Sequence, residues 1–338
     1  MKIKMIVAIS MVIGLSSIGI FGQAMAAEPE ATIVDAQMIW DKAPHNAFTN
    51  LIQYKGYWYC VFREGQGHVS DDGALRVIRS KDGEKWISAA LLTSKMADLR
   101  DAQICIMPDN RLMLSGAAAL HQPADARHQT IAYFSTDGTK WTAGHDVGEK
   151  DLWMWRVTWH KDVAYGIGYT TGEKWPTRFT RLYKSTDGTQ FTTLVDKLRD
   201  NEYSNESQLV FLQDDTALCL LRRDESPSGS KTGLLGKASP PYTEWTWQDL
   251  GTRIGGPCMI QLPDGRLVAA VRLYDKNVRT SLCWVDAENG TIKEFLELPS
   301  GGDTSYPGMV LHDGLLWVSY YSSHEKQTKI YLAKVKIN

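Results

Sequence analysis

The chain has 338 residues, 43% of them hydrophobic, and carries a formal net charge of −2 with a pI of about 6.5. A chain of this length and composition can bury a large core. The near-neutral charge excludes bulk electrostatic attraction to nucleic acid or to an anionic membrane surface, so neither is expected as a partner.

The first 26 residues have the three parts of a cleavable signal peptide. Lys2 and Lys4 form a basic start, residues 5–22 are apolar, and the small-residue pattern Ala24-Met25-Ala26 follows. A membrane anchor is the alternative, because the apolar run is near the lower limit for a membrane span. The cleavage pattern favours removal, so we predict a secreted or periplasmic protein without membrane contact, with residues 27–338 as one domain.

After the signal, short alternating runs are broken by Gly, Asp and Asn, which is typical of an all-β fold. One turn motif recurs, as Ser80-Lys-Asp-Gly-Glu-Lys-Trp86, Ser135-Thr-Asp-Gly-Thr-Lys-Trp141 and Ser185-Thr-Asp-Gly-Thr-Gln-Phe191. A degenerate fourth copy is Ser239-Pro-Pro-Tyr-Thr-Glu-Trp245. In these S-x-D-G turns the Ser and Asp side chains can hydrogen-bond the backbone while Gly takes a positive φ, so we interpret them as structural.

A turn followed by a strand also repeats six times along the chain. The copies are Lys55–Arg63, Asp109–Ala117, Lys161–Tyr169, Asp214–Arg222, Asp264–Arg272 and Asp313–Tyr321. Four-stranded units of this size, repeated radially, form a β-propeller, so we predict an all-β, six-bladed β-propeller over residues 45–338. Ala31–Asp41 has no turn partner and is predicted to complete the last blade, which would close the ring and protect its sheet edges.

Aligning the units places polar side chains at one end of the central channel, the channel mouth, where first strands begin and second strands end. The aligned first-strand residues are Ala47, Asp101, Glu206, Gly256 and Tyr306, and the aligned second-strand residues are Arg63, Arg222 and Arg272. Guanidinium groups donate paired hydrogen bonds to carboxylates. Three arginines at one mouth therefore predict a carboxylate ligand.

These residues and the three S-x-D-G turns resemble the exo-sialidase family of glycoside hydrolases, where such turns are called Asp boxes. The resemblance covers the whole mature chain and implies a propeller of the sialidase type. It implies that Tyr306 is the nucleophile, that Glu206 is its partner, and that Arg222 and Arg272 bind the substrate carboxylate. Arg100-Asp101 is similar to the family's Arg-Asp-Pro segment, which implies that Asp101 contacts substrate. The implied activity is retaining hydrolysis of a terminal sialic, related ulosonic or uronic acid.

A tyrosine nucleophile suits such a sugar, because a carboxylate nucleophile would be repelled by the acid group on the anomeric carbon. Tyr306 would pass its proton to Glu206, and nearby arginines are expected to favour the phenolate. The leaving group needs a carboxylic acid on a loop. We predict Asp71 as first choice and Asp72 as second, although both also fit an ordinary turn.

One position departs from the family pattern. The family's first arginine lies in a Phe-Arg-Ile-Pro motif that opens the first blade, and Ala47 stands at that position here. We hypothesise that Arg63 substitutes for it. His45 and His68 flank the same corner and are candidate acid/base or substrate contacts.

No cofactor and no metal is expected, because the five cysteines lie in strand-like runs and no metal-type Cys/His spacing occurs. Two other function classes stay open. A non-catalytic carbohydrate-binding propeller would be consistent with Ala47. A polysaccharide lyase or a variant glycosidase would use His and Tyr on a uronate. The expected partner is a glycan or glycoconjugate with a terminal acidic sugar, and a monomer is expected.

Overall fold

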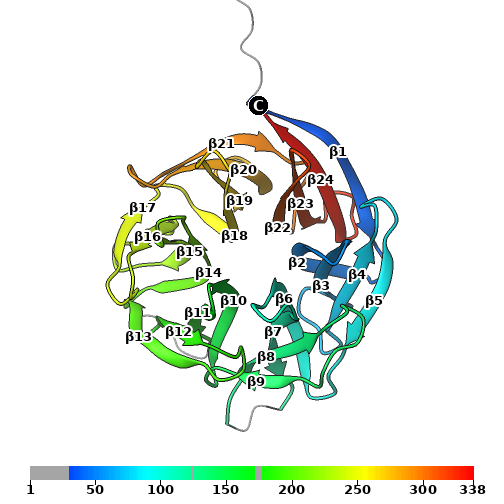
Figure 1. The fold of residues 1–338 in the computed structure, drawn as a ribbon, viewed down its shortest axis with the longest axis horizontal. Helices are drawn as coiled ribbons and strands as arrows, with labels where there is room; N and C mark the ends of the chain where they lie inside the picture. Colours follow the sequence, from blue (N-terminus) through cyan, green and yellow to red (C-terminus); the bar gives the residue numbers. More distant parts are fainter. Residues whose placement is uncertain (1–29, 123–124, 172–176) are drawn as a thin grey trace, which may run out of the picture.

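The computed structural model describes residues 30–122, 125–171 and 177–338, and these form six four-stranded antiparallel sheets around a central channel (Figure 1). The predicted all-β, six-bladed β-propeller is therefore confirmed. Within the described residues no helix is long and apolar enough to cross a membrane. The predicted signal peptide, residues 1–26, lies outside the described residues.

Blades 1 to 5 run outward from the channel in chain order, and blade 6 ends with β1 as its outermost strand. Blades 1 and 2 are β2 (His45–Tyr54), β3 (Tyr57–Gly65), β4 (Ala74–Ser80), β5 (Ile87–Leu92), β6 (Ala97–Ile106), β7 (Leu112–Leu120), β8 (His128–Ser135) and β9 (His145–Val147). Blades 3 and 4 are β10 (Leu152–His160), β11 (Val163–Thr170), β12 (Phe179–Ser185), β13 (Thr192–Asp200), β14 (Tyr203–Phe211), β15 (Ala217–Glu225), β16 (Leu234–Ala238) and β17 (Thr246–Asp249). Blades 5 and 6 are β18 (Ile254–Gln261), β19 (Leu267–Leu273), β20 (Arg279–Asp286), β21 (Thr291–Glu297), β22 (Thr304–His312), β23 (Leu315–Ser322), β24 (Lys329–Ile337) and β1 (Ala31–Trp40).

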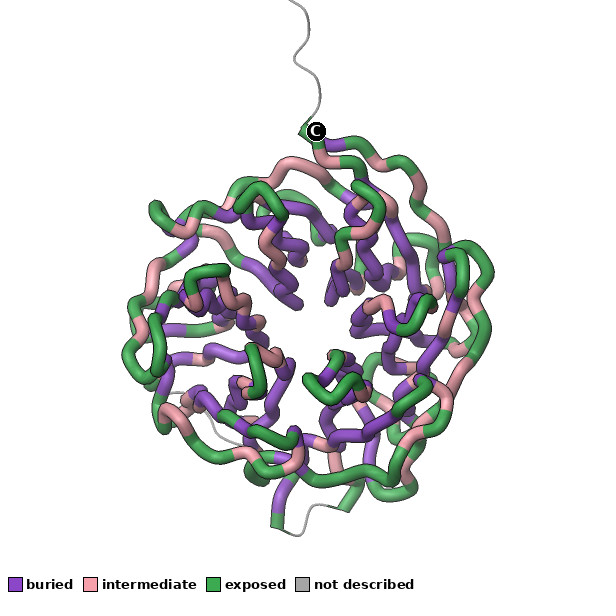
Figure 2. Tube along the Cα trace, viewed as in Figure 1, coloured by how far each residue is buried: buried purple, intermediate pink, exposed green. Residues whose placement is uncertain are grey.

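The ring closes through both ends of the described chain. β1 pairs antiparallel with β24 as the outermost strand of blade 6, as the sequence predicted. The inner strands are mostly buried, whereas an outer strand such as β5 is mostly partly or fully exposed (Figure 2). The core therefore lies between the blades and along the channel, which fixes the inner strands that carry the mouth residues.

The S-x-D-G turns join the third and fourth strands of their blades, at the end of the sheet opposite the mouth. In the first, Gly83 N–H donates to Ser80 Oγ at 2.8 Å and Lys85 N–H donates to Asp82 Oδ1 at 2.9 Å. Hydrogen bonds from the Lys85 and Glu84 N–H groups lower the pKa of Asp82 to about 2. The degenerate fourth turn keeps the shape, because Tyr242 takes the positive φ of the missing glycine, at 66°. The turns brace the blades and lie far from any mouth chemistry.

Every first strand carries a β-bulge just inside the mouth, where two residues oppose one on the second strand. The first bulge residues are Phe48, Asp101, Trp155, Asn205, Gly256 and Tyr306. This register corrects the alignment made from the sequence. Phe48, not Ala47, is equivalent to Asp101 and Tyr306, and Glu206 is the second residue of its bulge.

The second strands need a matching correction. Arg63 and Arg272 pair with the residue that precedes the bulge, and so does Arg223 in blade 4. Arg222 lies one residue earlier and opposes the bulge itself. Arg222 is therefore not the structural equivalent of Arg63 and Arg272, although it is the blade 4 arginine that reaches the centre of the mouth.

Candidate active site

The centre of the mouth is a hydrogen-bonded group of Tyr306, Glu206 and Arg222. Tyr306 Oη donates a short hydrogen bond to Glu206 Oε1. Arg222 Nη1 donates to the same carboxylate oxygen at 2.8 Å and to Tyr306 Oη at 3.1 Å. Glu206 Oε2 accepts the N–H of Gly256 at 2.9 Å. These three side chains come from blades 4 and 6, so the propeller ring brings them together across the channel.

Local backbone strain orients the tyrosine. Ser305 and Tyr306 have φ angles of 100° and 52°, which are uncommon for residues with a side chain. Such strain occurs at functional sites, where surrounding contacts hold it in place. The Tyr306 ring packs against Phe48, with ring centroids 4.9 Å apart, and against Trp155 and Tyr321 at 5.8 Å. The phenol oxygen is thereby fixed toward Glu206.

The protonation state of Tyr306 follows from its surroundings. Burial and the Glu206 carboxylate raise the pKa of the Tyr306 phenol well above its usual value, while Arg222 and Arg272 lower it. The arginines act in the predicted direction, but burial outweighs them. The resting phenol is neutral, and it can become a nucleophile by passing its proton along the existing hydrogen bond to Glu206.

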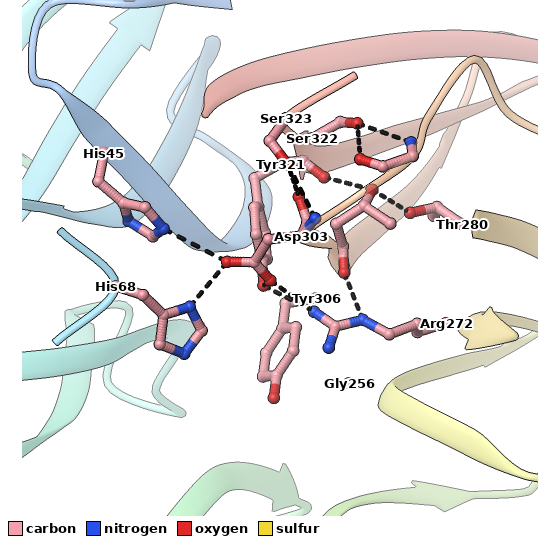
Figure 3. Close-up of polar contacts among 12 residues, drawn as sticks. His45, His68, Gly256, Arg272, Thr280, Asp303, Tyr306, Tyr321, Ser322 and Ser323 are labelled. Carbon is pink, nitrogen blue, oxygen red and sulfur yellow. Dashed lines mark hydrogen bonds and ion pairs between the residues drawn. The ribbon is translucent and has the colours of Figure 1, made fainter. Parts of the chain in front are cut away.

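A second group at the mouth contains Arg272, Asp303 and Tyr321 (Figure 3). Arg272 Nη2 donates to Asp303 Oδ1 at 3.2 Å and to Tyr321 Oη at 2.7 Å, and Arg272 Nε donates to the Thr304 carbonyl at 2.6 Å. The guanidinium carbon lies 5.3 Å from the centroid of the Tyr306 ring. Within the described residues, Nη1 of Arg272 has no hydrogen-bond partner, so one donor nitrogen remains for a ligand.

The two candidate histidines meet on Asp303. His45 Nε2 lies 3.3 Å and His68 Nδ1 lies 2.7 Å from Asp303 Oδ2, and Figure 3 shows both rings on one side of the carboxylate with Arg272 on the other. Burial alone would raise the pKa of Asp303, but hydrogen bonds from His45, His68 and Tyr321 hold it well below its usual value. The carboxylate is therefore ionised and shared by four side chains, those of His45, His68, Tyr321 and Arg272.

Arg63 does not face the mouth, which corrects the hypothesis that it replaces the missing arginine. Its side chain is fully buried, and Nε forms an ion pair with Asp98 Oδ1 at 2.8 Å. Its Nη1 and Nη2 atoms donate to the carbonyls of Gly67 at 2.7 Å and Ser70 at 3.2 Å. Arg63 therefore anchors the loop between β3 and β4, the loop that carries His68.

The two predicted acids, Asp71 and Asp72, are exposed in a turn of that loop. Hydrogen bonds from the Ser70 hydroxyl and the Gln66 N–H lower the pKa of Asp72, so its carboxylate stays ionised at neutral pH. Asp72 is therefore poorly suited to proton donation, and it serves the turn through the Gln66 contact at 3.1 Å.

Asp101, unlike Asp72, can hold a proton near neutral pH. Its side chain is buried at the first bulge position of blade 2, with a φ of 51°. Burial raises the pKa of Asp101 to about 7, and the neighbouring Arg100 guanidinium opposes this only in part. A carboxyl group that is half protonated near neutral pH can act as a general acid and then as a base.

Several donors near this centre are buried without a partner among the described residues. They include Nε of Arg222, Nε of Arg100 and Nε1 of Trp155. Buried donors usually have an acceptor, because leaving one unpaired costs about 1–3 kcal/mol. The unpaired Nε of Arg222, whose Nη1 contacts Tyr306, is consistent with an anionic ligand.

No protein-family model matches the chain, and no curated protein matches it. A Dyadobacter fermentans protein of unknown function superposes with a TM-score of 0.80 at 18% identity, over 92% of this chain and 100% of that one. Trypanosoma rangeli sialidase gives 0.67 at 12% identity over 86% of this chain, which spans only 55% of the sialidase. An α-L-arabinofuranosidase of Fusarium graminearum gives 0.69 at 12% identity over 90% and 98%. At such identities the likeness establishes the fold, and function must be argued from the site.

Proposed function

We propose that the protein is an exported exo-acting glycoside hydrolase that removes a terminal acidic sugar with retention of configuration. The observation that carries this proposal is the Tyr306 hydroxyl hydrogen-bonded to Glu206, with Arg222 contacting both groups. Sialidases with a tyrosine nucleophile are a known exception among retaining glycosidases. The sialidase and arabinofuranosidase among the structural neighbours support a propeller glycosidase, and the arginines at the mouth support an acidic substrate.

The reaction proceeds in two steps. Tyr306 Oη attacks the anomeric carbon as its proton passes to Glu206, while the glycosidic bond breaks and the leaving oxygen takes a proton from a carboxylic acid. Water then attacks the anomeric carbon, the same carboxylate removes its proton, and Glu206 returns a proton to the departing Tyr306 oxygen. Arg222 and Arg272 hold the substrate carboxylate and stabilise the charge that develops on the phenol oxygen.

Asp101 is our first choice for the acid, because its pKa of about 7 keeps it protonated at mildly acidic pH. Asp71, the first choice from the sequence, becomes the second choice, and it lies on an exposed turn of the loop at the mouth. The variants Asp101→Asn and Asp71→Asn separate the two. Only the variant that lacks the acid should lose the alkaline limb of the pH–rate profile and recover activity on substrates with a good leaving group.

A carbohydrate-binding propeller without turnover is the second candidate. The observation in its favour is that the donors of Arg63 are used internally. Of the three arginines that the sequence predicted at the mouth, Arg222 and Arg272 contact Tyr306. A site with fewer cations can still bind an anionic sugar, but it stabilises less charge in the transition state.

The proposal is tested with aryl glycosides of sialic, other ulosonic and uronic acids. Wild type should hydrolyse one class, and Tyr306→Phe should lose on the order of 10⁴-fold in kcat, as expected when a nucleophile is removed. Tyr320→Phe is the matched control, because its buried hydroxyl donates to the Pro299 carbonyl at 3.0 Å, away from Glu206. Equal activity of the Tyr306 variant would remove the nucleophile assignment. Binding without turnover would favour the second candidate, and ultraviolet-absorbing unsaturated products would indicate a lyase.

A further inference from the structure

We propose that His45, His68 and Asp303 bind a divalent transition-metal ion, with zinc as the best match to their donors. The three ligand atoms are two imidazole nitrogens and one carboxylate oxygen, and all lie within 4.8 Å of one another. In the part of the chain that the structure describes, they form the single such group of three. Zinc sites with three protein ligands keep a fourth position open for water or substrate.

The spacing of the donors fits one ion. Zinc binds nitrogen and oxygen at about 2.0–2.2 Å, so its ligand atoms lie about 3–4 Å apart. His45 Nε2 is already 3.3 Å from Asp303 Oδ2, while His68 Nδ1 is closer, at 2.7 Å. The His68 side chain is half exposed on the β3–β4 loop, so a small outward movement of that ring makes room for the ion.

The carboxylate is oriented before any ion binds. Tyr321 Oη donates to Asp303 Oδ1 at 2.7 Å, and Ser323 Oγ accepts the Asp303 N–H at 2.8 Å. The other oxygen, Oδ2, is left to the two imidazoles (Figure 3). Outer contacts of this kind fix the ligands of metal sites and raise their affinity. The Arg272 guanidinium on Oδ1 opposes a cation, so we expect weaker binding than in closed four-ligand zinc sites.

The location of the group gives the ion a role, and this step rests on the proposed function. His45 lies two residues before Ala47 on β2, so both side chains project from the same face of the strand. The alignment from the sequence put the family's missing first arginine at Ala47, and the observed register moves that position to the neighbouring Phe48, whose ring centroid lies 5.2 Å from that of His68. A zinc ion held by His45, His68 and Asp303 would place a positive charge in this corner, with its open position available to the substrate carboxylate.

Binding is tested first without any substrate, on full-length protein freed of metal by chelation. Calorimetric titration with Zn²⁺ should show one equivalent bound, and Co²⁺ should give visible absorption bands of a low-coordinate site. His68→Ala and Asp303→Asn should abolish both signals. His312→Ala is the matched control, because His312 forms a lone histidine–carboxylate pair with Asp313 at 3.2 Å and should leave binding unchanged.

Folding is monitored in the same experiment. Saturating Zn²⁺ should raise the Tm of wild type and of the His312 variant, because the ion binds the folded state and links blades 1 and 6. It should not raise the Tm of His68→Ala, whose half-exposed side chain is the ligand least needed for folding. No uptake by wild type, or equal uptake by His68→Ala, would overturn the site.

The role of the ion is judged separately from its binding. Chelated wild type should show a KM at least 10-fold higher than the zinc-loaded protein for the cleaved acidic glycoside, with restoration by Zn²⁺. Equal KM values would overturn the role in substrate binding. Zinc uptake in a protein that cleaves none of the glycosides would leave the site standing and refute the proposed function instead.

Discussion

Two junctions between neighbouring blades contain an arginine–aspartate ion pair, but the two pairs differ in exposure. At the blade 1–2 junction, Arg63 from the second strand of blade 1 pairs with Asp98, three residues before the bulge residue of blade 2. At the blade 5–6 junction, Arg272 pairs with Asp303, three residues before Tyr306. The first pair is sealed, with side-chain exposures of 0% and 6%, whereas the second is open, at 13% and 29%.

The second carboxylate oxygen, Oδ2, has different neighbours in the two aspartates. Asp98 Oδ2 is buried and has no hydrogen-bond partner among the described residues, but Arg100 Nη1 lies 3.6 Å away as a second cation in this closed pair. Asp303 Oδ2 instead faces His45 and His68, and its junction opens to the channel. Each arginine–aspartate pair therefore joins two neighbouring blades, and we call it a joint. Because the Arg272–Asp303 joint is exposed, its charged groups are available to a site.

The largest expected effect comes from breaking the sealed joint. Arg63→Met should lower the free energy of unfolding by about 3–5 kcal/mol, because it leaves the buried Asp98 carboxylate without its main partner. Arg272→Met should cost clearly less stability, because Asp303 keeps its two histidines and contact with water. Urea denaturation of both variants measures the difference. Equal losses would mean that the two joints are not structurally distinct.

Loss of the exposed Arg272–Asp303 pair should lower catalytic activity. Arg272→Met should cost about 2–3 kcal/mol of transition-state stabilisation, because a charged hydrogen bond to the substrate carboxylate is lost. This corresponds to a roughly 30- to 150-fold lower kcat/KM for an acidic glycoside. The Arg63 variant should keep nearly normal kcat/KM at temperatures where it remains folded. Initial rates at low substrate concentration provide the comparison. A catalytic loss confined to the Arg63 variant would reverse the assignment.

Asp101 and Tyr306 occupy equivalent positions, because each lies three residues after the aspartate of its ion pair. Asp101 has a pKa raised to about 7, so the folded protein keeps a proton between about pH 4 and 7 that the unfolded chain releases. Stability should therefore fall as pH rises through this window, by at most about 1.4 kcal/mol per pH unit for one proton. Asp101→Asn should flatten that slope. Urea midpoints at pH 4.5, 6 and 7.5 test this, and identical slopes would contradict it.

The fold was predictable from the sequence because its signals are local. Each S-x-D-G turn and each turn-strand unit specifies its own conformation, and repetition of the units specifies the ring. The exact register was not predictable, because each bulge adds one residue that leaves no mark in the hydrophobic pattern. That single residue explains why Ala47 was aligned in place of Phe48 and Arg222 in place of Arg223.

The site was predictable only in part. Tyr306, Glu206 and Arg222 were found through a resemblance that rests on short motifs. The burial of Arg63 depends on how residues 65–73 fold over it, which its own strand does not specify. Asp303 was missed, yet its spacing to Tyr306 repeats that of Asp98 to Asp101 and was a usable signal. The histidine–aspartate group combines three distant segments, so no local Cys/His spacing could indicate a metal.

The variant with the smallest expected effect on stability, Gly256→Ala, tests why the blade 5–6 joint is exposed. Its first-strand bulge holds Gly256, whereas the blade 1–2 joint has Phe48 at that position. Gly256 has a φ of 54°, and a methyl group there would lie 2.7 Å from the Tyr306 ring. Gly256→Ala should lose about 1–2 kcal/mol of stability from backbone strain. It should also lose activity, because the Tyr306 ring must move away from Glu206.

Gly314→Ala separates strain from displacement. Gly314 has a φ of 74° in a turn with open space around it, so its alanine variant should lose similar stability but keep full activity. The pair is compared by urea denaturation and by kcat on the cleaved glycoside. Equal activity in both variants would show that the ring tolerates the methyl group. The opening at the blade 5–6 joint would then depend on Asp303 and the histidines, and not on Gly256 beside the Tyr306 ring.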